Sequence, residues 1–163
     1  GVDNDALRYW ESAARQAASR SAHVEVISHV THALTVLARL PHDTDRDRVE
    51  LRLQLLLATR LIATEGYGAD RVERVYARAM ELANALGDEA ALMKILLGLE
   101  GYHFMRADFT KARDIAIDAG GRAKGQSSAD AIRRIQSKWA IANIVMHQGE
   151  METAVRQMDA CRA

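Results

Sequence analysis

Cysteine is almost absent from this sequence, and its scarcity limits both chemistry and compartment. Cys161 is the only cysteine among 163 residues, so an internal disulfide is excluded. A chain without disulfides suits a reducing compartment, and we expect a cytoplasmic protein. Cys161 falls at an apolar position of a helical pattern, where we expect a small hydrophobic side chain rather than a nucleophile.

An excess of charge of either sign is also lacking. Lys+Arg and Asp+Glu both total 22, so no bulk field would draw the chain to nucleic acid or to an anionic membrane. The most apolar run, LQLLLATRLIA, is too short to span a bilayer and is interrupted by Arg60. The first residues do not resemble a signal peptide. The last residues, CRA, continue a helical pattern without a stop signal, so we expect a piece of a larger protein.

Catalytic motifs are lacking as well. The sequence contains neither G-x-S-x-G nor G-x-x-x-x-G-K-[ST], and its Ser, His and Asp residues are scattered. The glycine-rich stretch AGGRAKGQSS (119–128) places its lysine before a glycine and follows no strand, so it is predicted to be a frayed helix end and a loop between repeats. We therefore expect a non-enzymatic protein that needs no cofactor.

One set of residues has the spacing of a helical metal site. Glu25, His29 and His32 lie four and three residues apart, which could bring them to one face of a helix. No further Cys/His motif would complete the coordination, and the surrounding SHVTHAL is amphipathic. We interpret this set as part of an ordinary helix and predict no metal site.

Proline and strand-like alternation are scarce, whereas helical periodicity runs through the whole chain. Pro41 is the only proline. Apolar residues recur at steps of three and four, as in Val72, Val75 and Tyr76, with Gly87 as a stop signal and Asp70 as the expected N-cap. The periodicity predicts eight helices joined by short connections into antiparallel hairpins. They are expected near residues 4–19, 22–39, 45–65, 70–86, 88–105, 108–124, 128–147 and 150–162.

Two stretches of the sequence repeat each other. FMRADFTKARDIA (104–116) and MHQGEMETAVRQM (146–158) align without a gap at an offset of 42 residues. Each has a small residue for a tight turn, an acid that favours a helix N-terminus, a large apolar residue, and then alanine. This matches the second half of the tetratricopeptide pattern. Equivalent seam positions, where the two helices of a hairpin approach, are predicted at Val26, Val75, Ala112 and Ala154. The sequence thus predicts one all-α domain over 1–163, a right-handed α-solenoid of about four tetratricopeptide-like hairpins.

From Leu7 through Met105 the sequence resembles a more specific family. It is similar to the tetratricopeptide-like region that follows the ATPase domain in large bacterial signalling proteins, which often carry a cyclase or a DNA-binding output domain. The resemblance implies a helper module beside a nucleotide-driven switch, with a role in signal transduction. The residues that carry it are Tyr9-Trp10, Ser21-Ala22-His23, Leu40-Pro41, Glu50-Leu51, Gly66-Tyr67 and Leu86-Gly87-Asp88.

Stacked hairpins create a concave surface lined by the first helix of each repeat, and a partner is expected to bind there. The predicted groove is cationic in its N-terminal half and rich in aromatic residues and methionine in its C-terminal half. Such a groove suits a peptide that has acids at one end and an apolar anchor at the other. The residues assigned to it are Arg8, Arg15, Arg60, Lys94, Phe104, Trp139, Asn143, Met146 and His147. For Phe104 and Trp139, packing between repeats is an equal alternative.

Several hypotheses of function stay open at this point. The first is a module that binds a protein or peptide partner, or other domains of the same parent chain. Another is a small-ligand sensor or intramolecular coupler that regulates an attached output domain. An open groove would favour peptide binding, whereas a deep pocket with converging polar groups would favour the sensor. An apolar terminal repeat would favour a homodimer. An all-helical enzyme is disfavoured because no catalytic constellation is present.

Overall fold

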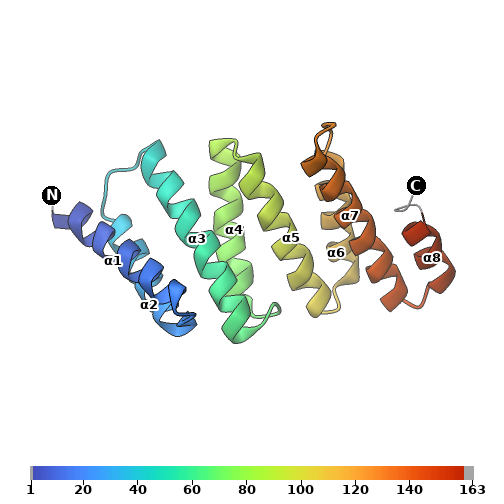
Figure 1. Cartoon of the computed structure of the whole chain (residues 1–163), viewed down its shortest axis with the longest axis horizontal. Coiled ribbons are helices and arrows are strands. Elements are labelled where there is room, and N and C mark those ends of the chain that lie inside the picture. Colours follow the sequence, from blue (N-terminus) through green and yellow to red (C-terminus); the bar gives the residue numbers. More distant parts are fainter. Residues whose placement is uncertain (1, 160–163) are drawn as a thin grey trace. The chain divides into compact units, whose positions relative to one another are not determined.

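A computed structural model describes residues 2–159, and the side chains of residues 5–159 apart from residue 129. This part of the chain contains eight α-helices and no strand, which confirms the all-α prediction (Figure 1). The helices are α1 (Val2–Ser19), α2 (His23–Leu37), α3 (Thr44–Glu65), α4 (Asp70–Leu86), α5 (Glu89–Met105), α6 (Phe109–Arg122), α7 (Ser128–His147) and α8 (Met151–Asp159). None of these helices is long and apolar enough to cross a membrane.

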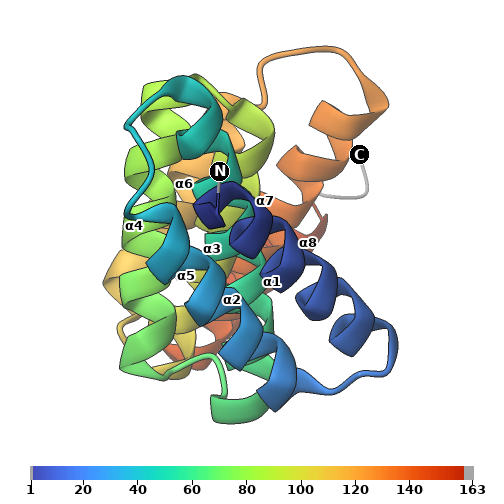
Figure 2. The same cartoon turned by 90° about the vertical axis from the view of Figure 1, so that its left-hand side faces the viewer.

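The chain divides into two compact units, residues 1–95 and residues 96–163, with the division inside α5. In the first unit consecutive helices pack against each other, α1 on α2, α2 on α3 and α3 on α4. Figure 2 shows α1 and α2 lying side by side as a hairpin. In the second unit α6 packs on α7 and α7 on α8.

Buried residues of the even-numbered helices recur at the same spacing, which explains why each of these helices packs along one stripe. Of the predicted seam residues, Val26, Ala112 and Ala154 are buried. Val75 is only half-buried, and the buried series of α4 begins at Val72 instead, so the prediction for this helix was wrong by one turn. The buried residues are Val26, Val30, Ala33 and Leu37 in α2, Val72, Tyr76, Ala79, Leu82 and Ala83 in α4, and Ala112, Ala116 and Ala119 in α6.

The same tight turn closes four of the helix pairs. In each turn one residue has positive φ, and the amide of the next residue donates to the carbonyl five residues earlier at 2.9–3.1 Å. This bond satisfies a carbonyl that the helix end would leave free. The residues with positive φ are Ser21, Gly87, Ala107 and Gly149. The turn predicted from the repeated stretches at Ala107 and Gly149 is thus confirmed.

Side chains cap several helix starts, although not the one that the sequence predicted at Asp70. The Asp43 and Ser127 side chains accept from the amides of Arg46 (2.7 Å) and Asp130 (3.1 Å). At α4, however, the N-cap position is Ala69, which makes no side-chain bond, and Asp70 is the first helical residue. The prediction of Asp70 as the N-cap was therefore wrong. The carboxylate lies in the first turn, where it still faces the positive end of the helix dipole.

A partly buried ion pair joins α3 to α4 in the first unit. Arg78 donates from Nε and Nη2 to the two oxygens of Glu50, at 2.7 and 3.1 Å, and Arg46 Nη1 lies 3.9 Å from Glu50. The hydrogen bonds from Arg78 hold the pKa of the Glu50 carboxyl below its usual value. A buried carboxylate is tolerated here because both of its oxygens are satisfied.

Candidate interaction surface

The first unit carries the cationic positions of the predicted groove. Arg8 and Arg15 are exposed and lie seven residues apart on α1, which places them on one helix face. Between them, Glu11 accepts a hydrogen bond from Arg52 Nη2 of α3 at 3.2 Å. Arg52 was missed by the sequence analysis, although it precedes Arg60 by eight residues and so shares its helix face. This surface carries charges of both signs, because the Glu11 carboxylate neutralises part of its positive charge.

Arg60 does not reach freely into solvent, as the predicted groove would require. Its side chain is half-buried, and Nη1 lies 3.4 Å from His23 Nδ1 at the start of α2. The Nε atom of Arg60 is buried without a hydrogen-bond partner among the described residues. Arg60 therefore packs between helices within the first unit. Lys94, by contrast, is exposed on α5.

In the second unit, Phe104 belongs to a small aromatic cluster. Its ring makes edge contacts with Phe109 and His147, with centroids 5.7 and 4.9 Å apart. His147 is exposed, and its Nδ1 lies 2.8 Å from the main-chain oxygen of Asn143. Of the two alternatives stated for Phe104, the structure favours packing between helices.

Trp139, in contrast to Phe104, is 59% exposed on α7. Asn143 and Met146 follow at steps of four and three, on the same face, and are half-buried. Two large apolar residues that precede Trp139 on this face, Ile132 and Ile135, are 55% and 49% exposed. The sequence analysis did not include them among the residues of the predicted groove.

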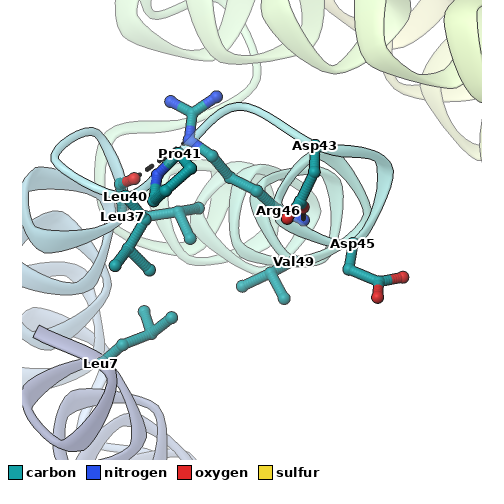
Figure 3. A pocket seen from close by; sticks show the side chains of 8 residues that line it. All are labelled: Leu7, Leu37, Leu40, Pro41, Asp43, Asp45, Arg46 and Val49. Atoms are coloured by element: carbon teal, nitrogen blue, oxygen red, sulfur yellow. Dashed lines mark hydrogen bonds between the residues drawn. The ribbon is translucent and has the colours of Figure 1, made fainter. Parts of the chain in front are cut away.

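A shallow pocket opens in the first unit between α1, α2 and the start of α3 (Figure 3). It encloses about 360 Å³ over an apolar floor of Leu7, Leu37 and Val49. The guanidinium of Arg46 donates from Nε to the Leu37 carbonyl at 3.0 Å, and the Asp45 carboxylate points away from the floor. Polar groups therefore do not converge on this pocket, which lacks the feature expected of a ligand sensor.

The histidines considered as metal ligands instead flank an aromatic ring. His29 and His32 lie 5.5 and 4.6 Å from Trp10, centroid to centroid, and His32 is stacked on it. Within the described part of the chain, no three His, Cys, Asp or Glu residues are grouped as a metal would require. Cys161 lies outside the described residues.

The glycine-rich stretch includes the last turn of α6, residues 119–122, and the connection to α7, residues 123–127. α6 ends at Arg122, and Ser127 caps α7. Arg134 Nη1 donates to the carbonyls of Ala123 and Gly125, both at 2.8 Å. A cation thus holds this loop through its oxygens, whereas a phosphate-binding loop presents its amides.

Comparisons with protein-family models, with curated proteins and with solved structures found no match to this chain. The fold by itself defines the class, an all-α protein whose consecutive helices pack against each other. Its function has to be argued from the surfaces described above.

Proposed function

We propose that this chain is a non-enzymatic module for protein–protein interaction, folded as a right-handed solenoid of tetratricopeptide-like hairpins. The recurring turn at Ser21, Ala107 and Gly149 supports the repeat, because each lies between the two helices of a proposed hairpin. The resemblance of residues 7–105 supports a place beside a signalling ATPase in the cytoplasm, where the module would contact a partner protein or another domain of its own chain.

The observation that carries this proposal is the exposure of Trp139. A tryptophan side chain buries a large area when it is covered, and such residues dominate the binding energy of many interfaces. Trp139 is 59% exposed and has two exposed isoleucines on the same helix face. A helix that keeps its largest apolar side chain outside the core is typical of an interaction surface.

The test is affinity capture from a lysate with the wild type, Trp139→Ala and Ile117→Ala. Ile117 is the matched control, since it is 51% exposed but lies on α6. We expect a protein that the wild type and Ile117→Ala retain and that Trp139→Ala loses, with unchanged helicity by circular dichroism. Equal capture by all three proteins would contradict the proposal, and loss of helicity in Trp139→Ala would place the ring in the core.

A small-ligand sensor is the second candidate, favoured by the volume of the pocket over Leu7, Leu37 and Val49, although polar groups do not converge on it. Its volume of about 360 Å³ lies in the range of small-molecule sites. A ligand that raises the unfolding temperature of the wild type, but not of Val49→Trp, would support this function over the first.

A further inference from the structure

The connection between α2 and α3, residues 38–43, lies beside a carboxylate that the described residues leave unsatisfied. Asp47 belongs to the first turn of α3, and only 15% of its side chain is exposed. Its Oδ1 atom is buried and accepts no hydrogen bond from the part of the chain that the structure describes. Because a buried oxygen without a donor costs free energy, a donor that reached this atom would stabilise the fold.

Two basic side chains lie close to Asp47 Oδ1 without bonding to it. Arg46 Nη1 is 3.7 Å away and, like Oδ1, is buried without a hydrogen-bond partner among the described residues. The Nε atom of the same guanidinium is held by the Leu37 carbonyl at 3.0 Å, which fixes the position of the group. His42 Nε2 is the nearer of the two, at 3.5 Å. His42 is therefore the residue whose small movement can supply the donor.

The other charged groups around this pair are already engaged with one another. The Asp43 carboxylate accepts from the main-chain amide of Arg46 at 2.7 Å. The ion pairs of the cluster are Arg78 of α4 with Glu50 and Glu81, Arg46 with Glu50, and Arg48 with Asp45. A proton on His42 thus adds a positive charge opposite Asp47, while the neighbouring charges keep their own partners.

The protonation state of His42 decides how well it can act as this donor. A neutral imidazole carries one N–H, which can sit on either ring nitrogen, whereas the imidazolium carries an N–H on both and a positive charge. Only the imidazolium offers Asp47 a charge-assisted hydrogen bond, which is roughly twice as strong as a neutral one. The His42 side chain is 69% exposed, so it exchanges protons with solvent while it faces a carboxylate that is mostly buried.

We propose that His42 and Asp47 form a proton-operated latch, which fastens the α2–α3 connection to the first turn of α3 when the imidazole is protonated. The same connection supplies Leu40 and Pro41 to the wall of the pocket in Figure 3. Protonation of His42 therefore also steadies one wall of that pocket. This inference goes beyond the proposed function and does not require a partner protein.

The sign of the pH dependence follows from the pairing. The imidazolium faces a carboxylate in the folded protein and water in the unfolded chain, so the folded state binds this proton more strongly. The latch therefore adds to the free energy of unfolding on the acidic side of the histidine range, and this contribution is lost as the pH rises through neutrality. Asp47 has to stay ionised, so the effect belongs to pH values above the range in which carboxyl groups titrate.

Limited proteolysis measures the latch at the connection itself. Trypsin can cleave after Arg39 in the α2–α3 connection and after Lys124 in the α6–α7 connection, and both residues are exposed. The ratio of the two rates cancels the pH dependence of the protease. We expect cleavage at Arg39, relative to Lys124, to be about threefold slower at pH 5.5 than at pH 8.0 in the wild type. His42→Gln should abolish this difference.

Two further variants test the pairing. Asp47→Asn should also abolish the pH-dependent difference, and adding His42→Gln to it should change nothing more, because each substitution removes the same contact. His32→Gln is the matched control, since His32 is an exposed histidine whose ring stacks on Trp10. It should keep the pH dependence of the wild type.

Urea unfolding provides a readout that does not depend on a protease. His42→Gln should lower the free energy of unfolding at pH 5.5 and leave it unchanged at pH 8.0. An equal pH dependence of Arg39 cleavage in the wild type and His42→Gln would overturn the latch. A dependence that His42→Gln abolishes but Asp47→Asn retains would overturn Asp47 as the partner, and a loss in His32→Gln would overturn the assignment to His42.

Discussion

At the scale of single residues, Glu100 has a carboxyl group whose environment disfavours its charge. It is half-buried on α5, and burial raises the pKa of the carboxyl. A pKa that is higher in the folded state means that the folded protein binds more protons than the unfolded chain between the two pKa values. The free energy of unfolding therefore falls as pH rises through the folded pKa.

We expect Glu100→Gln to make the protein more stable than the wild type near pH 7 and to abolish this part of the pH dependence. The amide cannot ionise, so the cost of burying a charge disappears. Urea unfolding of both proteins from pH 4 to pH 8 measures the difference in stability, which should grow with pH. Glu152→Gln, at an exposed position of α8, serves as the control and should show no such trend. A constant difference across the range would contradict this account.

At the scale of elements, α6 and α7 approach each other closely at Gly120. A Cβ placed there would lie 2.5 Å from Ser137 Oγ. This hydroxyl is buried and donates to the carbonyl of Ala116, also at 2.5 Å, so it cannot move away without losing its hydrogen bond. A Cβ added at the neighbouring Gly121 would meet no heavy atom within 4 Å. The two glycines thus provide a matched pair on one helix.

We expect Gly120→Ala to destabilise the protein by about 1–3 kcal/mol through overpacking and a strained hydrogen bond. Gly121→Ala should be neutral or stabilise it by about 0.5 kcal/mol, because alanine favours the helix. Denaturant unfolding of both variants measures the contrast. Adding Ser137→Ala to Gly120→Ala should restore part of the loss, since the obstructing oxygen is then removed. Similar stabilities for the two glycine variants would contradict the proposed contact.

At the scale of the whole molecule, the shared turn offers a way to measure cooperativity. Ser21 lies in the first unit and Ala107 in the second, and both have positive φ, with values of 55° and 59°. This conformation is costly for residues other than glycine. Substitutions at these two positions can therefore report on each unit separately.

We expect Ser21→Gly and Ala107→Gly each to stabilise the protein by about 0.5–1 kcal/mol. Glycine relieves the backbone strain at positive φ, and this gain exceeds the cost of the greater conformational entropy of the unfolded chain. If the chain is one domain, as the sequence predicts, calorimetry should show one transition, and the double variant should gain the sum of the two effects. Two transitions, each shifted by only one of the substitutions, would contradict a single cooperative domain.

The sequence by itself determined the local order of this protein. The helices and the turns at Ala107 and Gly149 follow from periodicity and from small residues, because helix formation and helix ends depend on neighbours within a few positions. The same local reasoning misplaced the seam of α4 at Val75 by one helical turn and its N-cap at Asp70 by one residue, since such shifts along a helix give almost equal sequence patterns.

Only the tertiary structure decided which side of each helix is covered. Periodicity shows that Ile132, Ile135 and Trp139 share a face, but whether that face is buried depends on helices distant in the sequence. The same holds for Arg60 beside His23, for Glu50 paired with Arg78, and for the close contact at Gly120. Each of these contacts joins residues that come together only when the helices pack, so no local sequence pattern predicts it.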